Sequence, residues 1–437
     1  MNSFLTVVGA GLAGSEAAWQ AAENGVPVVL YEMRPNQPTP VHKTSQCAEL
    51  VCSNSLGSLN ETSAPYLLKK ELRNLNSLVI KAADQHAVPA GAALAVDRDL
   101  FSAEITRHLE NHPNITFKRE EIEKIPDEGP VVIATGPLTS PSLSSEIAKL
   151  MGDEYLYFYD ALSPIVDANT IDTSKAFFAS RYGKGTADYL NCGMTREQYD
   201  AFLDALLKAE KVALKEFEKP VYFEGCMPIE ELASRGHKTL AFGPMKPVGL
   251  NHPVTGERFY AVVQLRKENK EGTAYNIVGF QTKLTYPGQK EIFRMIPGLE
   301  KAEFFRYGAI HRNTYVNAPE LLDLNFQVKE KPGLYFAGQI VGVEGYVESC
   351  AMGAMAGLSG SRQIQGKPFK LPPGDTAIGS LLKHVLEKGK GSFQPMNINF
   401  GLFTGKETRI RDKKLRNAAI VERALNAQED WLENLKS

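Results

Sequence analysis

The first 32 residues of the chain carry the pattern that most constrains its fold. A short apolar run, Phe4–Val8, leads directly into the glycine-rich segment Gly9–Gly14 (GAGLAG), and an alanine-rich segment with helical character follows it. A second apolar run, Val26–Tyr31, ends on Glu32. A strand, a glycine turn, a helix, a second strand and an acid in this order are typical of the first unit of a dinucleotide-binding α/β fold.

Each glycine of this turn has a separate predicted role. Gly9 permits the tight turn, Gly11 lets the backbone approach a pyrophosphate, and Gly14 lets the helix pack closely on the strand. The helix N-terminus offers N–H groups and positive potential to phosphates, and Glu32 stands where a carboxylate binds the adenosine ribose. A purely structural glycine turn is the alternative. The residues predicted to bind the dinucleotide are Gly9, Ala10, Gly11, Leu12, Ala13, Gly14 and Glu32.

The composition limits the class of protein. The chain has 437 residues, a length that predicts two or three domains, and 43% of them are hydrophobic. Its net charge of -2 attracts no polyanion globally, so any contact with nucleic acid needs a local patch. No apolar run approaches the ~18 residues of a membrane span. Five scattered cysteines without a C-x-x-C motif favour reduced thiols in a cytoplasmic protein without structural zinc.

A late segment, Gly333–Gly360, has a sequence pattern similar to that of the N-terminal unit. A strand that ends at Gly338 and Gln339 is followed by a glycine-containing turn and a helix of very small residues, Glu348–Ser361. Because each glycine costs a helix about 1 kcal/mol against alanine, these residues indicate that something lies very close to the helix. In FAD proteins a late strand, turn and helix direct the helix N-terminus at the flavin. Tight helix packing alone is the alternative.

The glycine turn and its acid suit NAD as well as FAD. The N-terminal position of the turn, together with the late flavin-type segment, favours FAD, with Gly338 and Gln339 in contact with it. Gln339 stands where many FAD enzymes carry an Asp that binds the ribityl chain, and its amide can still form neutral hydrogen bonds. The sequence has no second G-x-G-x-x-G, so a pyridine nucleotide has no Rossmann domain of its own.

The middle of the chain has a different sequence pattern from both ends. We predict an α/β protein: a Rossmann-type FAD-binding domain of the two-dinucleotide flavoprotein kind, formed by residues 1–175 and 305–437. An inserted α+β domain occupies residues 176–304, where a capping-box pattern at Thr195 opens a helix that runs to about Glu218.

Further local predictions follow from spacing and composition. Leucines at helical spacing predict one helix over Ala64–Ile80, Asp99 is the predicted cap of the next helix, and Thr239–Phe242 reads as a strand. The C-terminal stretch Gly405–Asn417 is locally basic. This stretch is interpreted either as a phosphate-binding segment or as a solvated helix face.

Taken in order, the motifs resemble one family over essentially the whole chain. The motifs are GAGLAGSEAAWQAA with YEMRP, AELVCSNSL, VYFEGCMPIEE, FGPMKPVGL and GLYFAGQIVGVEGYVESCAMG. They resemble the folate- and FAD-dependent tRNA uracil-5-methyltransferases, the TrmFO family. A larger flavoprotein that modifies wobble uridines of tRNA shares the FAD fold.

The resemblance implies a reaction. Methylenetetrahydrofolate supplies a one-carbon unit, reduced FAD supplies electrons, and NADH or NADPH reduces the FAD again. The product is 5-methyluridine in the T-loop of tRNA, at uridine-54. Uracil C5 is a poor nucleophile, and addition of a thiolate at C6 activates it. A reactive cysteine and a reduced flavin must therefore meet in one pocket.

The resemblance also implies roles for two of the cysteines. By analogy, Cys226 is the thiolate that adds to uracil C6. Cys52 lies beside the flavin, where it protects or handles the methylene–flavin species, and the two roles can be exchanged. Cys47, Cys192 and Cys350 are interpreted as packing residues, because free cysteines are usually small buried hydrophobes.

Weaker candidates complete the predicted site. Tyr346 stands at the turn before the flavin helix, where it can stack on the flavin, hydrogen-bond near it or relay a proton. His311 can stack on a folate pterin, although a lone histidine is more often structural. Glu344 and Glu348 flank Tyr346, and either can accept a proton if it is desolvated.

Other functions remain open at this point. A flavin oxidoreductase acting on a small molecule needs no RNA. The wobble-uridine reaction ordinarily needs a partner GTPase and more C-terminal chain. A flavin-binding RNA chaperone would not need Cys52 or Cys226. A methyltransferase using S-adenosylmethionine is disfavoured, since it has no use for paired flavin-type motifs. No membrane and no obligate protein partner are expected.

Overall fold

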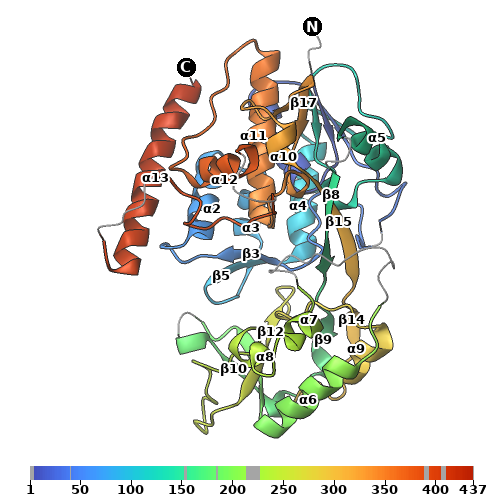
Figure 1. The fold of residues 1–437 in the computed structure, drawn as a ribbon, viewed down its shortest axis with the longest axis vertical. Coiled ribbons are helices and arrows are strands. Elements are labelled where there is room, and N and C mark those ends of the chain that lie inside the picture. Colours follow the sequence, from blue (N-terminus) through green and yellow to red (C-terminus); the bar gives the residue numbers. More distant parts are fainter. Residues whose placement is uncertain are drawn as a thin grey trace.

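The computed structural model describes residues 4–39, 41–151, 155–183, 186–212, 227–387, 393–404 and 410–436. Its largest body, the upper one in Figure 1, is built on a six-stranded sheet with the order β16-β17-β7-β1-β2-β6. All neighbours in this sheet are parallel except β16 and β17. The strands are β1 (Leu5–Val8), β2 (Val28–Tyr31), β6 (Ile115–Lys118), β7 (Val131–Ile133), β16 (Gln327–Val328) and β17 (Lys331–Phe336).

The central strands of this sheet are buried on both faces. In β1, Val7 lies opposite Leu30 on one side and Val132 on the other, and all three are buried. Continuous apolar runs are what a parallel sheet covered by helices requires. The helices that pack on this sheet include α1 (Leu12–Glu23), α4 (Arg98–Glu110) and α11 (Tyr346–Ile364), and α2 (Ala64–Asn74), α3 (Leu78–Gln85) and α5 (Pro141–Met151) belong to the same body.

Helices α1 and α11 pack closely enough to explain the small residues of α11. A Cβ atom added to Gly353 would lie 2.1 Å from the carbonyl oxygen of Ala13, and one added to Gly357 would lie 2.3 Å from that of Ala17. The two backbones are therefore in direct contact. Helix packing accounts for these two glycines, while the N-terminal end of α11 lines a cavity.

Two helix predictions in this body are wrong in detail. The single helix predicted over Ala64–Ile80 is two helices, because Asn76 adopts a positive φ of 55° and the Ser77 hydroxyl accepts a hydrogen bond from the N–H of Ile80. Ser77 thus caps a new helix within an unbroken leucine pattern. The cap of α4 is Asp97, whose carboxylate accepts from the backbone of Leu100, and not Asp99.

The second body is built on a six-stranded antiparallel sheet (Figure 1). Its order is β10-β11-β12-β13-β9-β14, and its core residues run from Val166 to Ala302. The strands are β9 (Ile165–Asp167), β10 (Ala176–Ala179), β11 (Tyr189–Met194), β12 (Ala261–Lys267), β13 (Ala274–Ile277) and β14 (Phe304–Arg306). The helices are α6 (Arg196–Lys208), α7 (Ile229–Ser234), α8 (Thr239–Phe242) and α9 (Tyr286–Phe293). The division of the chain at residues 176 and 304 stays a prediction.

The capping box at Thr195 is confirmed, with reciprocal hydrogen bonds between Thr195 and Gln198. Helix α6 ends at Lys208, ten residues before the predicted end. The segment Thr239–Phe242 is a short helix and not a strand, because the N–H of Phe242 bonds back to the carbonyl of Lys238. That turn buries Leu240 and leaves Phe242 exposed.

Two smaller sheets complete the fold. Strands β8 (Tyr155–Ala161) and β15 (Ile310–Val316) form an antiparallel ribbon that runs between the two bodies (Figure 1). Strands β3 (Ser55–Ser58), β4 (Ala87–Val88) and β5 (Ala93–Val96) form the other sheet, in the order β3-β5-β4. The short 3-10 helices are η1 (Gly136–Leu138), η3 (Ala168–Thr170), η4 (Thr173–Lys175), η5 (Arg181–Gly183) and η7 (Gln339–Val341).

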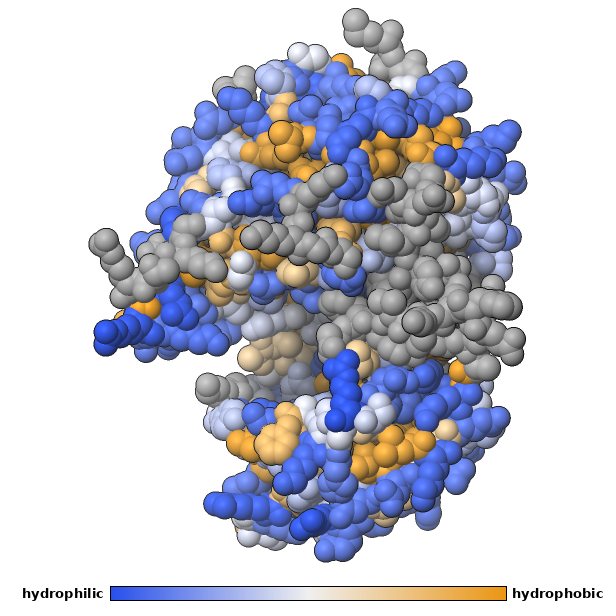
Figure 2. Space-filling model, viewed as in Figure 1, coloured by the Kyte–Doolittle hydropathy of each residue, from blue (hydrophilic) through white to orange (hydrophobic). Residues whose placement is uncertain are grey.

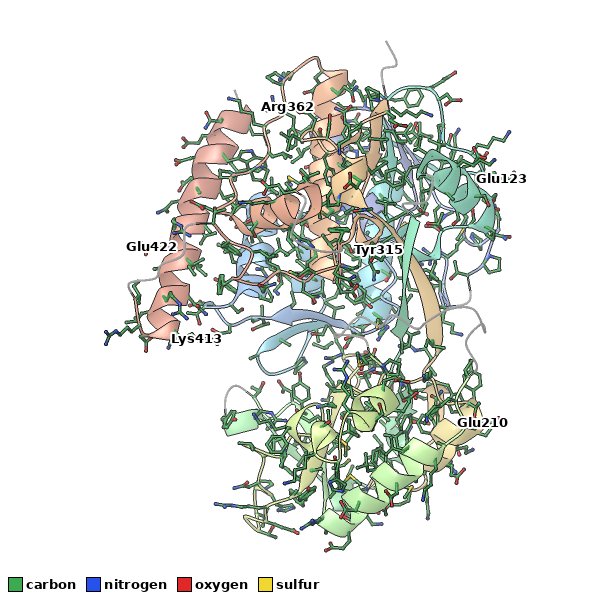
Figure 3. All side chains as sticks on the ribbon, viewed as in Figure 1. Glu123, Glu210, Tyr315, Arg362, Lys413 and Glu422 are labelled. Carbon is green, nitrogen blue, oxygen red and sulfur yellow. The ribbon has the colours of Figure 1, made fainter. Side chains whose placement is uncertain are left out.

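The C-terminal helices return to the first body. They are α10 (Ala318–Leu321), α12 (Ala377–Leu386) and α13 (Lys413–Lys436). Helix α13 lies at the outer edge, where Lys413 and Glu422 project from it (Figure 3). Hydrophilic residues cover much of the visible surface, with apolar areas between them (Figure 2). Among the described helices, none combines the length and the apolar character needed to cross a membrane.

Candidate functional site

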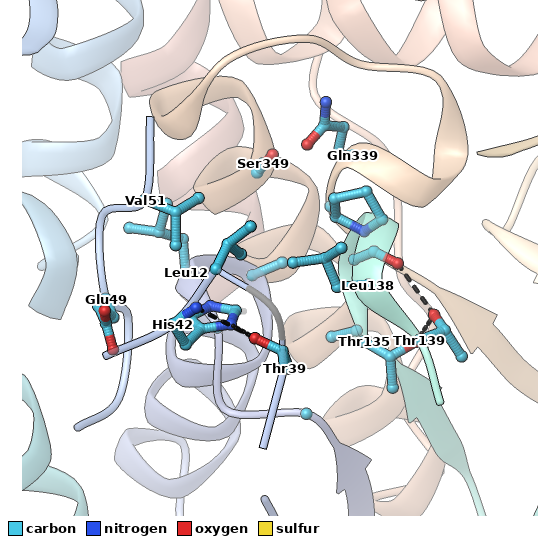
Figure 4. A pocket seen from close by; sticks show the side chains of 18 of the residues that line it. Leu12, Thr39, His42, Glu49, Val51, Thr135, Leu138, Thr139, Gln339 and Ser349 are labelled. Atoms are coloured by element: carbon cyan, nitrogen blue, oxygen red, sulfur yellow. Dashed lines mark hydrogen bonds between the residues drawn. The ribbon is translucent and has the colours of Figure 1, made fainter. Parts of the chain in front are cut away.

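A cavity opens at the carboxyl ends of the parallel strands β1, β2, β7 and β17 (Figure 4). Ligands of open α/β sheets bind in this position. Its volume is about 380 Å³, and small-molecule sites range from ~300 to ~1,000 Å³. Residues that line it include Gly9, Gly11, Leu12, Ala13, Glu32, Val51, Cys52, Ser53, Thr135, Gly136, Leu162, Gly338, Gln339, Glu344, Gly345, Tyr346 and Ser349.

The three glycines of the N-terminal turn differ in what surrounds them. Gly9 has a φ of +96°, and a Cβ there would lie 2.8 Å from the carbonyl oxygen of Ala134. A Cβ on Gly14 would lie 1.7 Å from the carbonyl oxygen of Gly9, so helix and strand are in contact there. A Cβ on Gly11 would meet no described atom within 4 Å, and Gly11 lines the cavity. The space over Gly11 and the uncapped start of α1 fit a pyrophosphate.

Glu32, at the end of β2, is held in place by its neighbours. One carboxylate oxygen accepts the N–H of Ala10 at 2.9 Å, and the other accepts Nε of Arg34 at 2.9 Å. Burial acts to raise the pKa of Glu32, but the hydrogen bonds and charge of Arg34 outweigh it and hold that pKa below its usual value. A carboxylate has about four acceptor positions, so Glu32 can still accept ribose hydroxyls. Ala10 and Gly14 do not line the cavity and act by positioning it.

The late segment forms the opposite side of the cavity. Gly338 has a φ of +89°, and Gln339 Nε2 donates to Glu344 Oε2 at 2.9 Å. Helix α11 begins at Tyr346 after Gly345, which has a φ of +117° and no side chain with which to cap the helix. The residue before the helix therefore supplies no acceptor for its first N–H groups. In Figure 4, Gln339 and Ser349 lie across the cavity from His42 and Thr39.

Tyr346 connects the start of α11 with Cys52. Its Oη accepts the N–H of Cys52 at 2.7 Å and the N–H of Ser53 at 3.0 Å. Burial raises the pKa of Tyr346 well above its usual range, and a charge on Cys52 adds to the effect. The hydroxyl therefore keeps its proton near neutral pH, and that proton is available for donation because Oη uses its lone pairs for the two N–H groups. Tyr346 is the first residue of α11 and not part of the preceding turn.

The Cys52 thiol is partly exposed and lines the same cavity. Its Sγ lies 3.8 Å from the carbonyl oxygen of Ala161. Cys47, Cys192 and Cys350 are fully buried, as expected of packing residues. Burial raises the pKa of Cys47 and of Cys192 to about 12 and also raises that of Cys350 well above its usual value, so these three thiols are not nucleophiles at neutral pH.

Sequence reasoning missed two arginines that hold the segment carrying Cys52. Arg98, on α4, donates Nη1 to the carbonyl of Leu50 and pairs with Glu268. Arg266, on β12, donates Nη2 to Ser53 Oγ at 2.7 Å and Nε to Asn54 Oδ1 at 2.9 Å. No motif or spacing links residues so far apart in the sequence, so only the fold reveals them.

The remaining predicted residues fall in three places. Cys226 lies outside the described residues. His311 belongs to β15, where it is paired with Asp160, and its side chain lies outside the description. Glu344 lines the cavity, whereas Glu348 does not; its carboxylate accepts the N–H of Ile398 at 3.1 Å, and burial raises its pKa. Groups of three or more side chains suited to hold a metal ion are absent from the described part of the chain.

Comparison with known proteins identifies the family. The family model described as glucose inhibited division protein A (GIDA) matches residues 5–368. The methylenetetrahydrofolate–tRNA-(uracil-5-)-methyltransferase TrmFO of Natranaerobius thermophilus is 57% identical over 429 residues, which are 98% of this chain and 99% of that protein. The chain belongs to the TrmFO family. The TrmFO protein of Heliobacterium modesticaldum is also 57% identical, over 99% of this chain and 98% of its own length.

Solved structures agree with the fold expected for a TrmFO-family protein. The GidA protein of Aquifex aeolicus, in its form II crystal, superposes with a TM-score of 0.71 at 20% identity and covers 98% of this chain and 73% of its own. The form I crystal gives a TM-score of 0.69 at 19% identity, covering 97% and 76%. The likeness concerns the fold alone, and it confirms the predicted Rossmann-type α/β class.

Proposed function

We propose that this chain methylates C5 of uracil in tRNA, at uridine-54 of the T-loop, with the one-carbon unit of methylenetetrahydrofolate. Electrons come from reduced FAD, and NADH or NADPH reduces the FAD. The observation that carries the proposal is identity of 57% over nearly the full length to relatives with that printed name. The cavity supports it independently, because a partly exposed thiol, Cys52, and the dinucleotide turn line the same space.

The residues of the cavity fit FAD. Gly11 and the start of α1 are suited to the pyrophosphate, Glu32 to the adenosine ribose, and the start of α11 to the flavin ring. Gly338 and Gln339, which follow β17 and line the cavity, are proposed to contact the cofactor. When bound, the flavin supplies the hydride that converts a methylene into a methyl group.

Four side chains act on the reacting groups in this proposal. Cys226 adds to uracil C6, and its sulfur leaves when the C5 proton has been removed. Cys52 lies beside the flavin, and Tyr346 fixes the Cys52 backbone while holding a proton on Oη that it can donate into the cavity. Glu344 is a candidate acceptor for the C5 proton, since it is buried and lines the cavity.

Folate and tRNA need further contacts. His311 is proposed to stack on the pterin of folate. Lys413 and Lys414, at the exposed start of α13, are proposed to contact phosphates of tRNA. A local contact of this kind is required because the net charge of the chain is only -2.

The test is an RNA assay on the purified protein. Undermodified tRNA, methylenetetrahydrofolate and NADH or NADPH are supplied without S-adenosylmethionine, and 5-methyluridine is measured by mass spectrometry. Cys226→Ala and Cys52→Ala are measured in parallel, with Cys47→Ala as the matched control because its buried thiol is unreactive. We expect folate-dependent product that is lost in Cys226→Ala and retained in Cys47→Ala.

Two other outcomes would change the account. Product that persists in Cys226→Ala and is lost in Cys52→Ala would exchange the two thiol roles. A flavin that binds and is reduced, with no product under any folate condition, would favour a small-molecule flavin oxidoreductase. Product at the wobble uridine would favour the other tRNA modification.

A further inference from the structure

A cluster of charged side chains surrounds Cys52 where the two bodies meet. Arg98 comes from α4, Arg266 and Glu268 from β12 and the loop that follows it, and Arg306 from β14. Tyr346 completes the cluster from α11. Three arginines and one acid leave this region with an excess of positive charge beside the thiol.

Arg98 and Arg266 have ordinary structural partners. Arg98 pairs with Glu268 and donates to the carbonyl of Leu50. Arg266 donates to the uncharged oxygens of Ser53 and Asn54. Glu268 therefore neutralises Arg98. The contacts of Arg266 hold the segment of Ser53 and Asn54 in place but do not neutralise the charge of Arg266.

Arg306 has no such partners. Its Nε and Nη2 atoms are buried, and no acceptor among the described residues lies within hydrogen-bond distance of either atom. The surrounding charges that act on it are those of Arg98, Glu268, Tyr346 and Cys52. Burial, with the charge of Arg98, lowers the pKa of Arg306 to about 10, so the guanidinium is still charged near neutral pH.

Guanidinium nitrogens that are buried without an acceptor are costly, so Nε and Nη2 of Arg306 call for an explanation. The strand register places Arg306 opposite Ile165, only a few residues beyond Ala161, whose carbonyl oxygen lies 3.8 Å from Cys52 Sγ. Of the three acids that act on Arg306, Glu268 is paired with Arg98 and Tyr346 keeps its proton, which leaves Cys52. A thiolate there would be the missing anion.

We propose that Arg306 is a positioning residue that stabilises the thiolate of Cys52. The proposal rests on the proposed function only for the use of that thiolate in the reaction. An opposite charge nearby favours the charged form of an acid, and Arg306 and Cys52 are close enough for their charges to interact. The thiol proton is released to solvent, and the positive charge of Arg306 favours the anion that remains. Arg98 contributes in the same direction, while Glu268 opposes both.

Alkylation of Cys52 measures its protonation state directly, because the thiolate is the nucleophile and iodide is the leaving group of iodoacetamide. The FAD-bound protein is treated across about pH 6 to 9.5, a range that brackets the ordinary thiol value of about 8.5. The peptide that contains Cys52 is then quantified by mass spectrometry, which separates it from Cys226. The assay needs neither folate nor tRNA.

Arg306→Met removes the charge and keeps the aliphatic stem, while Arg306→Lys keeps the charge. Arg294→Met is the matched control, since Arg294 lies in the same body and bonds to Ala302 and Glu303. We expect Arg306→Met to raise the midpoint of Cys52 alkylation by about one pH unit, a tenfold slower reaction below the midpoint. Arg306→Lys and Arg294→Met should keep the midpoint of the wild type.

An unchanged midpoint of Cys52 alkylation in Arg306→Met would overturn the proposal. Equal shifts of this midpoint in Arg306→Met and Arg306→Lys would also overturn it. Bound FAD and the thermal unfolding midpoint check the fold; because Nε and Nη2 of Arg306 make no hydrogen bond to the described residues, Arg306→Met should not lower that midpoint. Should this variant fail to fold, Arg306→Gln provides a second neutral side chain. If Arg306→Met shifts the alkylation midpoint but the protein methylates no tRNA, the role of Arg306 holds and the proposed function fails. If tRNA is methylated but the midpoint does not shift, the proposed function holds and the role of Arg306 fails.

Discussion

Replacing Gly353 by alanine tests whether the contact between α1 and α11 shapes the cofactor cavity. The new Cβ would lie 2.1 Å from the carbonyl oxygen of Ala13, whereas carbon–oxygen contacts in proteins begin near 3.3 Å. The two helices must therefore separate by about 1 Å at this point. Both helices begin at the cavity, where Leu12 and Tyr346 line it, so the displacement reaches both sides of the ligand.

The cost can be estimated from general values. Overpacking of a tight contact costs about 1–3 kcal/mol, and alanine in place of glycine returns about 1 kcal/mol in helix propensity. We therefore expect Gly353→Ala to lower the free energy of unfolding by up to about 2 kcal/mol. If a similar energy is lost in cofactor binding, FAD binds about tenfold more weakly, since 1.4 kcal/mol corresponds to a factor of ten.

Gly360→Ala is the matched control on the same helix. A Cβ at Gly360 would meet the flexible Leu5 side chain, with Cδ1 at 2.8 Å, and no backbone atom. Urea unfolding followed by the fluorescence of Trp19 and Trp431, together with FAD titration, compares the two variants. Equal stability and equal FAD affinity for Gly353→Ala and Gly360→Ala would show that the contact between α1 and α11 does not shape the cavity.

Three more predictions concern single groups. Tyr346→Phe leaves the N–H groups of Cys52 and Ser53 without their acceptor, so we expect methylation to fall at least about tenfold with FAD retained; full activity in the tRNA assay would contradict this. Burial raises the pKa of Glu71 to about 8 from an ordinary value of 4.5, so its contribution to stability is complete below about pH 4.5 and is lost as the pH rises to 8. In this range the wild type should lose up to about 1.4 kcal/mol of its free energy of unfolding per pH unit, and Glu71→Gln should not. Urea unfolding at several pH values measures this loss, and the same pH dependence in both proteins would contradict the role of Glu71. Replacing Lys413 and Lys414 together by glutamate should weaken tRNA binding and flatten its salt dependence while NADPH oxidation stays unchanged; identical salt slopes would rule out the phosphate contact.

The cofactor side of the cavity could be predicted from the sequence because its signals are local. The turn of Gly9, Gly11 and Gly14 needs only a neighbouring strand and helix, and the late segment repeats that arrangement around Gly338. Backbone conformation and close approach decide which residues these positions accept. The positions of these residues follow from chain geometry over a few residues, which a pattern can record.

The errors arise where local patterns allow two structures. The leucine spacing continues across Asn76, so the same buried face serves one long helix or two shorter ones, and the positive φ of Asn76 decides between them. The four residues of Thr239–Phe242 suit a strand by composition, but a single backbone hydrogen bond to Lys238 closes them into a helical turn. Periodicity cannot separate these cases over so short a length.

The environment of Cys52 could not be predicted because it is assembled from distant segments. Arg98, Arg266 and Arg306 belong to a helix and two strands, and none of them stands in a motif with the cysteine. An arginine is usually exposed, so the sequence gives no reason to expect the buried and unpartnered nitrogen atoms of Arg306. Such groups become visible only when the fold brings the two bodies together.

The most direct test of the account follows the carbon atom. Methylenetetrahydrofolate labelled with carbon-13 at the methylene is incubated with the protein, undermodified tRNA and NADPH, and the nucleosides are analysed by mass spectrometry. We expect 5-methyluridine in the T-loop that carries the label. Unlabelled 5-methyluridine, or label in another nucleoside with none in 5-methyluridine, would contradict it.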